Sequence, residues 1–312
     1  MDPVLVSVIV PYYKRPDAIG RCLDSIFQQE YPNREVILVD SQSEDNVESL
    51  IRARGHQIKL LELPDNHGVN AARNAGIQAA KGQILVFVDD DMGFHSPSEL
   101  TKVVTAFEIH PTIHVLAFQV VDPDGKLRLR EWCHPRYWKE FSETEFETHY
   151  FCEGACAFRR DVFDVCGGFY EPYFLGAESW DLVLRLLDRG FRILYCPEIR
   201  SWHRPSVKGR TTYRQFYYFT RSYVWTAYKD YHFPHGLFFL APKLAMMLYF
   251  TVRTRSYRPF LRGIWDGIVG LKRVHNDRTP VNKATLRYVA ELDKWRPSLR
   301  VRFGRHNSGV LL

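Results

Sequence analysis

The chain has 312 residues, of which 46% are hydrophobic and 25% charged, and this composition excludes a disordered protein. Its length allows one large domain, or a domain with an appendage, around a sizeable core. The formal net charge is +6. Because basic residues dominate from Arg200 onward, we expect an anionic partner there, either a phosphate-bearing ligand or an anionic membrane face.

Strands and helices alternate along residues 4–88. We expect strands at residues 4–10, 35–40, 58–63 and 84–88, and helices that begin at Pro16, Val47 and Asn70. This alternation predicts a doubly wound, parallel sheet. The sequence has neither the G-x-G-x-x-G pattern after its first strand nor a G-x-x-x-x-G-K-[ST] pattern, so a dinucleotide oxidoreductase and a P-loop kinase are disfavoured.

Three carboxylates, Asp89, Asp90 and Asp91, directly follow the apolar strand expected at 84–88. Like charges this close raise one another's pKa, and a divalent cation is the usual remedy. Ligands of open α/β sheets bind beyond the carboxyl ends of the strands, where these acids and Asp40 fall. We therefore expect a nucleotide whose diphosphate is met through a metal; the plainer alternative is an acidic turn in solvent.

The second half of the chain is less regular. Further strands are expected at 113–118, 151–158 and 191–196, and helices at 100–109, 161–165 and 181–189. Residues 126–150 are polar and aromatic without a clear period, which suggests a loop over a site. The start of the chain lacks a signal-peptide pattern, and the six cysteines lie mostly in apolar segments, so we expect buried, reduced thiols and a cytoplasmic location.

The last third of the sequence predicts basic, aromatic helices. Apolar residues recur at helical spacing along 213–224. The apolar window 236–252 holds Pro242 and Lys243 and is shorter than the roughly 20 residues of a membrane span. Two alternatives stay open for it: a helix in the membrane interface, or a helix packed on the preceding domain.

Six segments, in order along residues 4–205, resemble the inverting glycosyltransferases of family 2, which have the GT-A fold. They are Val8–Tyr13, Leu38–Ser41, Asn70–Gly76, Phe87–Asp91, Phe158–Arg160 with Gly167–Phe169, and Gly176–Leu182 followed by His203. The resemblance implies a Rossmann-like, mostly parallel sheet flanked by helices. It also implies a catalytic domain at 1–205, with a nucleotide-binding half near 1–95 and an acceptor half near 96–205, and a helical extension at 206–312.

The resemblance also assigns roles to individual residues. The nucleotide would be bound by Pro11, Tyr12, Asp40, Arg73, Asp89 and Asp90. Mn²⁺ or Mg²⁺ would be held by Asp89 and Asp91, the D-x-D pair, with His203 as a further ligand. Apart from the resemblance, the basic residues Lys208 and Arg210 could stabilise the diphosphate on a closing loop. The plainer alternative for this segment is a helix whose aromatic face packs on the preceding domain.

Inverting transfer needs one general base that takes the proton of the acceptor hydroxyl. The family places this base in an acidic pair, but the second position of that pair is Ser179 in this sequence. We expect Glu178 to be the base and Asp181 to cap or position its helix, with Glu153 as an alternative base.

The predicted function is transfer of a sugar from a nucleoside-diphosphate sugar, with UDP favoured and GDP or TDP left open, to a saccharide or lipid-linked acceptor. This is the chemistry of cell-surface glycan synthesis, carried out in the cytoplasm or peripherally at the inner membrane face. Alternatives are a catalytically impaired binding module, suggested by Ser179, and a nucleotidyltransferase, which the glycine-free stretch after the first strand disfavours. No nucleic-acid-binding motif accompanies the basic region, so nucleic acid is not an expected partner.

Overall fold

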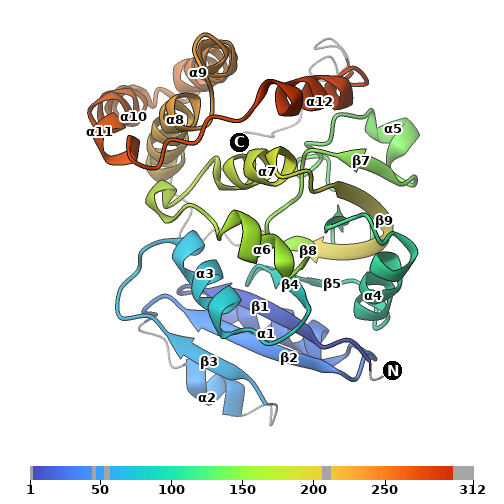
Figure 1. Ribbon diagram of the computed structural model, residues 1–312. Helices are drawn as coiled ribbons and strands as arrows, with labels where there is room; N and C mark the ends of the chain where they lie inside the picture. Colours follow the sequence, from blue (N-terminus) through green and yellow to red (C-terminus); the bar gives the residue numbers. More distant parts are fainter. Residues whose placement is uncertain (1–2, 44–46, 53–56, 206–211, 298–312) are drawn as a thin grey trace.

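The computed structural model describes residues 3–43, 47–52, 57–205 and 212–297, and its centre is one mixed β-sheet (Figure 1). The strands follow the order β3-β2-β1-β4-β8-β6-β9-β5, and β7 pairs with β9. Their bounds are β1 Val6–Tyr12, β2 Arg34–Asp40, β3 Lys59–Glu62, β4 Ile84–Val88, β5 Met92–Phe94, β6 Val115–Val121, β7 Phe146–Thr148, β8 Ala155–Arg159 and β9 Ile193–His203.

Helices cover both faces of this sheet. Side chains of α1, α2 and α4 share one buried cluster with the sheet, and those of α3, α6 and α7 share the other. The bounds are α1 Pro16–Phe27, α2 Val47–Arg52, α3 Val69–Ala79, α4 Glu99–Ile109, α5 Trp138–Phe141, α6 Asp161–Cys166, η1 Glu171–Tyr173 and α7 Glu178–Asp188. The apolar stripes read from the sequence are therefore the faces that the helices bury.

The two halves of the sheet differ in strand direction. β3, β2, β1 and β4 are parallel, as the alternating pattern predicts, and β1, β2 and β4 end at one edge. Beyond β4 the sheet is mixed: β8 is antiparallel to β4 and β6, and β5 and β7 are antiparallel to β9. The predicted Rossmann-like sheet is thus confirmed, with its parallel strands concentrated in the N-terminal half.

β9 runs past the point where the sequence predicts its end. Pro197 lacks a backbone N–H and reads as a strand terminator, yet β9 continues to His203. The pairing with β6 shifts at this point: Phe118 lies opposite Cys196, and Gln119 lies opposite Arg200. A bulge accommodates the proline, and it carries β9 on to the edge where His203 faces Met92.

In the C-terminal region the structure describes residues 212–297, which form five helices at one end of the molecule (Figure 1). They are α8 Thr212–Lys229, α9 His235–Thr254, α10 Tyr257–Val269, α11 Leu271–Val274 and α12 Lys283–Asp293. The helical character predicted for this region is confirmed. Lys208 and Arg210 lie outside the described residues.

Candidate active site

A cavity of about 470 Å³ opens at the edge where β1 and β4 end. Its walls come from the β1 terminus, the acids after β4, the first turns of α3 and α7, and the C-terminal helices α8 and α9. The predicted site residues among its lining are Pro11, Tyr12, Arg73, Asp89, Asp90, Glu153 and Glu178. Pro11 and Glu178, the most widely separated of these predicted residues, lie 167 positions apart in the sequence.

Arg73 and Asp89 form an ion pair in the lining of this cavity. Nη2 of Arg73 lies 2.9 Å from Oδ1 of Asp89, and Arg73 is buried. Burial alone would lower the pKa of Arg73, but the attraction of Asp89, Glu153 and Glu178 raises it, so the guanidinium stays charged. Gly154 leaves the room for Asp89, because a Cβ at this position would lie 2.5 Å from Cγ of Asp89.

Arg15 neutralises the two acids that follow Asp89. Its Nη1 lies 2.7 Å from Oδ1 of Asp90 and 3.3 Å from Oδ2 of Asp91. Burial raises the pKa of Asp90 to about 7, while Arg15 opposes that rise. All three carboxylates therefore face a protein cation: Arg73 pairs with Asp89, and Arg15 lies against both Asp90 and Asp91. The sequence predicted no site role for Arg15.

His203 lies between two acids. Its Nδ1 is 2.8 Å from Oε1 of Glu131, and its Nε2 is 3.6 Å from Oδ1 of Asp91. Burial by itself would lower the pKa of His203, but the interactions with Asp91 and Glu131 leave the pKa raised. Within the residues that the structure describes, no group of three or more His, Cys, Asp or Glu side chains forms a ready-made metal centre.

The Asp91–His203 pair nevertheless fits a divalent cation. Mg²⁺ and similar ions are often bound through one or two protein ligands, with substrate phosphates and waters completing the shell. Nε2 of His203 is buried and has no hydrogen-bond partner, and the Glu131 carboxylate holds the opposite ring nitrogen, as in carboxylate–histidine–metal arrangements. A cation bound between Asp91 and His203 would replace the proton on Nε2 of His203.

Glu178 is the first residue of helix α7, is buried, and belongs to the lining of the cavity. Its Oε2 is buried without a hydrogen-bond partner. Burial raises the pKa of Glu178 to about 7, repulsion by Glu153 adds to that rise, and attraction by Arg73 opposes it. A carboxylate in this range can accept a proton near neutral pH.

Asp181, one turn further along α7, does not line the cavity. It is fully buried, with Oδ2 2.6 Å from Nη2 of Arg185 and Oδ1 against Nζ of Lys229. Burial raises its pKa, but the two cations outweigh burial and hold the pKa below its usual value. The position fits the expected role of Asp181 in placing its helix, and the pair with Lys229 ties α7 to the end of α8.

Asp40 ends β2 close to the cavity but does not line it. Its Oδ1 accepts a hydrogen bond of 2.9 Å from the backbone N–H of Ser43, and the neighbouring Ser41 is a lining residue. The contact of Asp40 with a nucleobase stays a prediction.

Several lining residues were not expected from the sequence. Glu131 and Tyr150 come from the stretch at 126–150, and Phe219 and Met247 come from α8 and α9. The loop predicted over a site therefore does border the cavity. None of the six cysteines forms a disulfide, but only Cys22, Cys156 and Cys196 are buried, so the expectation that the thiols are buried is wrong for Cys133, which is exposed.

Comparison with known proteins identifies the catalytic fold. The model of glycosyl transferase family 2 matches residues 7–167. The O-antigen biosynthesis protein RfbC of Myxococcus xanthus is 27% identical over 225 residues, which is 66% of this chain and 18% of RfbC. The O-antigen chain rhamnosyltransferase WbaN of Salmonella anatum is 24% identical over 225 residues, covering 68% of this chain and 70% of WbaN. This chain spans 18% to 37% of the length of the first three curated relatives.

Solved structures of glycosyltransferases share the architecture. The mannosyltransferase PcManGT from Pyrobaculum calidifontis, in complex with GDP-Man and Mn²⁺, aligns over 93% of this chain and 87% of its own, with a TM-score of 0.56 and 22% identity. Residues 1–349 of TarS from S. aureus, in complex with UDP-GlcNAc, align over 97% and 93%, with a TM-score of 0.59 and 19% identity. These likenesses confirm the predicted GT-A fold.

Proposed function

Because the chain belongs to glycosyl transferase family 2, we propose that this glycosyltransferase is an inverting, metal-dependent enzyme that uses a nucleoside-diphosphate sugar. The donor would be a UDP-sugar, or else a GDP- or TDP-sugar, and the acceptor a hydroxyl of a saccharide or lipid-linked glycan. Relatives named for O-antigen synthesis, and one named for glucosyl transfer to a diphosphoundecaprenol-linked sugar, support an acceptor of the cell-surface glycan class.

The observation that carries this proposal is the position of Glu178. A buried carboxyl group with an unpartnered Oε2 and a pKa near 7 shares one cavity with Asp89 and Arg73. In the proposed reaction Glu178 takes the proton of the acceptor hydroxyl while that oxygen attacks the anomeric carbon and the nucleoside diphosphate leaves. Attack and departure on opposite faces of the sugar ring invert the configuration.

The other residues bind and orient the donor. Pro11, Tyr12 and Arg73 would form the nucleotide pocket, with Asp40 beside it and Asp89 toward the ribose. Asp91 and His203 would hold Mn²⁺ or Mg²⁺, whose chemistry is to offset the negative charge that grows on the leaving diphosphate. Residues 1–205 would be the catalytic domain, and the C-terminal helices would complete the cavity through Phe219 and Met247.

A thermal-shift series tests the proposal. Because a ligand that binds only the folded state raises the melting temperature, UDP, GDP and TDP are compared with and without Mn²⁺. We expect one diphosphate to stabilise the protein, and to do so only with the metal. Glu178→Gln should keep that shift and lose transfer by about 10²-fold or more.

Two results would contradict the proposal. Full transfer by Glu178→Gln would exclude Glu178 as the base, and Glu153→Gln is the matched variant that would then be expected to fail. If no nucleotide stabilises the protein with or without metal, the site is inactive or serves another ligand, and the catalytically impaired binding module that Ser179 suggests becomes the favoured function.

A further inference from the structure

One surface of the molecule, formed by the outward sides of α9 and α10, is apolar; we call it the α9–α10 face. On α9 its members recur at intervals of three and four residues: Leu237, Phe238, Ala241, Pro242, Ala245, Leu248, Tyr249 and Val252. On α10 they are Tyr257, Leu261, Trp265, Ile268 and Val269. Phe238 is 71% exposed, Leu261 61% and Trp265 64%, and the α9 row alone is about 22 Å long.

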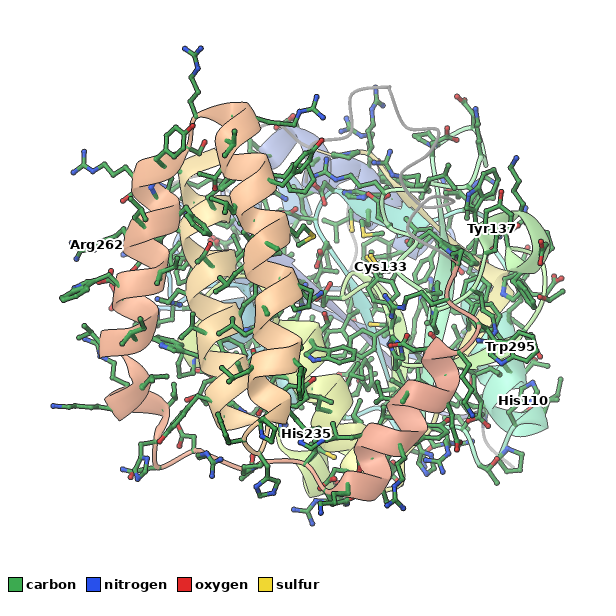
Figure 2. All side chains as sticks on the ribbon, turned by 90° about the horizontal axis from the view of Figure 1, so that it is seen from above. His110, Cys133, Tyr137, His235, Arg262 and Trp295 are labelled. Atoms are coloured by element: carbon green, nitrogen blue, oxygen red, sulfur yellow. The ribbon has the colours of Figure 1, made fainter. Side chains whose placement is uncertain are left out.

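The packing of these helices explains why their large apolar side chains point outward. A Cβ at Gly263 would lie 2.7 Å from the carbonyl oxygen of Tyr217, and one at Gly267 would lie 2.9 Å from Cβ of Val224. Gly236 of α9 approaches α8 in the same close way. α9 and α10 thus dock on α8 through their glycine-bearing sides, and Figure 2 shows α9 and α10 beside α8 with Arg262 projecting away from the layer.

Lys243 is the only charged residue between Leu237 and Val252, a stretch that the structure describes in full, and its side chain lies away from the α9–α10 face. Its Nζ lies 5.5 Å from the ring centre of Tyr223 and 6.0 Å from that of Phe239, on the inner side of α9. The exposed row therefore carries no charge within itself.

Basic residues border this apolar row. Residues 235–274 contain seven lysines and arginines and one acid, so they account for the whole net charge of +6 and leave the rest of the chain balanced. Arg253, Arg255, Arg258 and Arg262 are all exposed at the α9–α10 corner and along α10. An apolar row with a basic border complements a membrane surface that carries anionic lipids.

Helix α9 links the α9–α10 face to the candidate active site. Met247, adjacent to Leu248 in α9, lines the cavity, and so does Phe219 of α8. One side of α9 thus borders the cavity while the other side belongs to the α9–α10 face. A surface that binds this face would lie one helix diameter, about 10 Å, from the cavity.

We infer that the α9–α10 face rests on an anionic lipid bilayer, with α9 in the plane of the interface, and that this places the cavity beside a lipid-linked acceptor. The membrane contact is inferred from the α9–α10 face itself, whereas the lipid-linked acceptor rests on the proposed function. By length and composition α9 is, among the described residues, the one helix able to cross a membrane. It packs instead on α8 and α10, where Met247, Phe216 and Phe260 form one buried cluster that a spanning α9 would break.

Vesicle co-sedimentation of the full chain tests the inference. The probes are vesicles of phosphatidylcholine alone and of phosphatidylcholine with phosphatidylglycerol. We expect binding to the anionic vesicles only, released by high salt, and weakened at least about tenfold by Arg255→Glu with Arg258→Glu. Leu261→Glu with Trp265→Glu should weaken it as strongly. Ile109→Glu is the matched control, because Ile109 is 66% exposed on α4 and its neighbour His110 lies across the view from Arg262 (Figure 2).

Each other outcome would overturn the inference. Equal binding to neutral vesicles would remove the role of the basic border, and binding that resists salt and alkaline extraction would mean that α9 inserts. A wild-type dimer in sedimentation velocity that Trp265→Glu dissociates, without vesicle binding, would assign the face to a second copy of this chain. The nucleotide-dependent thermal shift, measured without vesicles, separates these outcomes from failure of the proposed function.

Discussion

Nδ1 of His203 lies 2.8 Å from Oε1 of Glu131, although 72 positions separate the two residues in the sequence. The contact orients the imidazole so that Nε2 faces Asp91 at 3.6 Å. Glu131 is thus a positioning residue for the proposed cation, since it acts through His203.

Glu131→Gln should weaken Mn²⁺ binding about tenfold or more, because loss of the carboxylate frees the ring and lowers its basicity. Titration of Mn²⁺ followed by electron paramagnetic resonance, with the nucleotide that stabilises the protein, measures the affinity directly. Glu198→Gln, at an exposed acid of β9, is the control. Unchanged Mn²⁺ affinity in Glu131→Gln would mean that His203 does not ligate the cation.

The pH profile of transfer should report on Glu178. Since the base acts when deprotonated and its pKa is about 7, kcat/KM should fall on the acidic side of pH 7. Glu153→Gln removes a repulsive charge, so the pKa of Glu178 should decrease and the acidic limb should move to lower pH. A limb that stays in place, measured with donor saturating and acceptor limiting, would show that Glu153 does not act on the base.

Two acids one turn apart on α7 should affect stability in opposite directions. Asp181→Asn leaves Arg185 and Lys229 without their shared carboxylate and should cost about 3–5 kcal/mol of the free energy of unfolding. The pKa of Asp181 is lowered in the folded state, so its contribution is present above the usual aspartate pKa and is lost as the pH falls. The deficit of Asp181→Asn should therefore shrink in acid.

Glu178→Gln is the matched comparison. The pKa of Glu178 is raised in the folded state, so the contribution of its protonated form to the stability of the protein is lost as the pH rises through about 7. A neutral glutamine keeps that stability, and the variant should melt at or above the wild-type temperature at pH 8. Equal losses in Asp181→Asn and Glu178→Gln, measured by thermal unfolding, would contradict the separate roles.

Gly154→Ala should impair nucleotide binding more than folding. The added Cβ would lie 2.5 Å from Cγ of Asp89 and would push that side chain off Arg73. Gly190→Ala is the converse: its surroundings are open, but its φ of +83° is strained for alanine, at about 1–2 kcal/mol. The nucleotide-dependent thermal shift should decrease in the first variant and persist in the second, whose melting temperature without ligand should be lower.

Local pattern was sufficient for the elements that carry the site. The apolar run at 84–88 followed by three acids predicts a buried strand with a charged end, and β4 and Asp89–Asp91 confirm that placement. The alternation of strands and helices predicts the parallel half of the sheet, because the spacing of apolar residues in each element indicates its type and its buried face. The antiparallel strands beyond β4 were not predictable in this way, because pairing direction depends on how distant segments meet.

The partners of the charged residues are what only the tertiary structure decided. Arg15 lies 75 positions from Asp90, and Lys229 lies 48 from Asp181, yet each pair is in contact. The sequence by itself determined which side chains could ionise and on which elements they sit. The tertiary structure places Asp181 between two cations, which lower its pKa, and buries Glu178 where its pKa is raised to about 7. These differences follow from the order of strands in the sheet and the docking of α8 on α7, because electrostatic energies depend on distance in space.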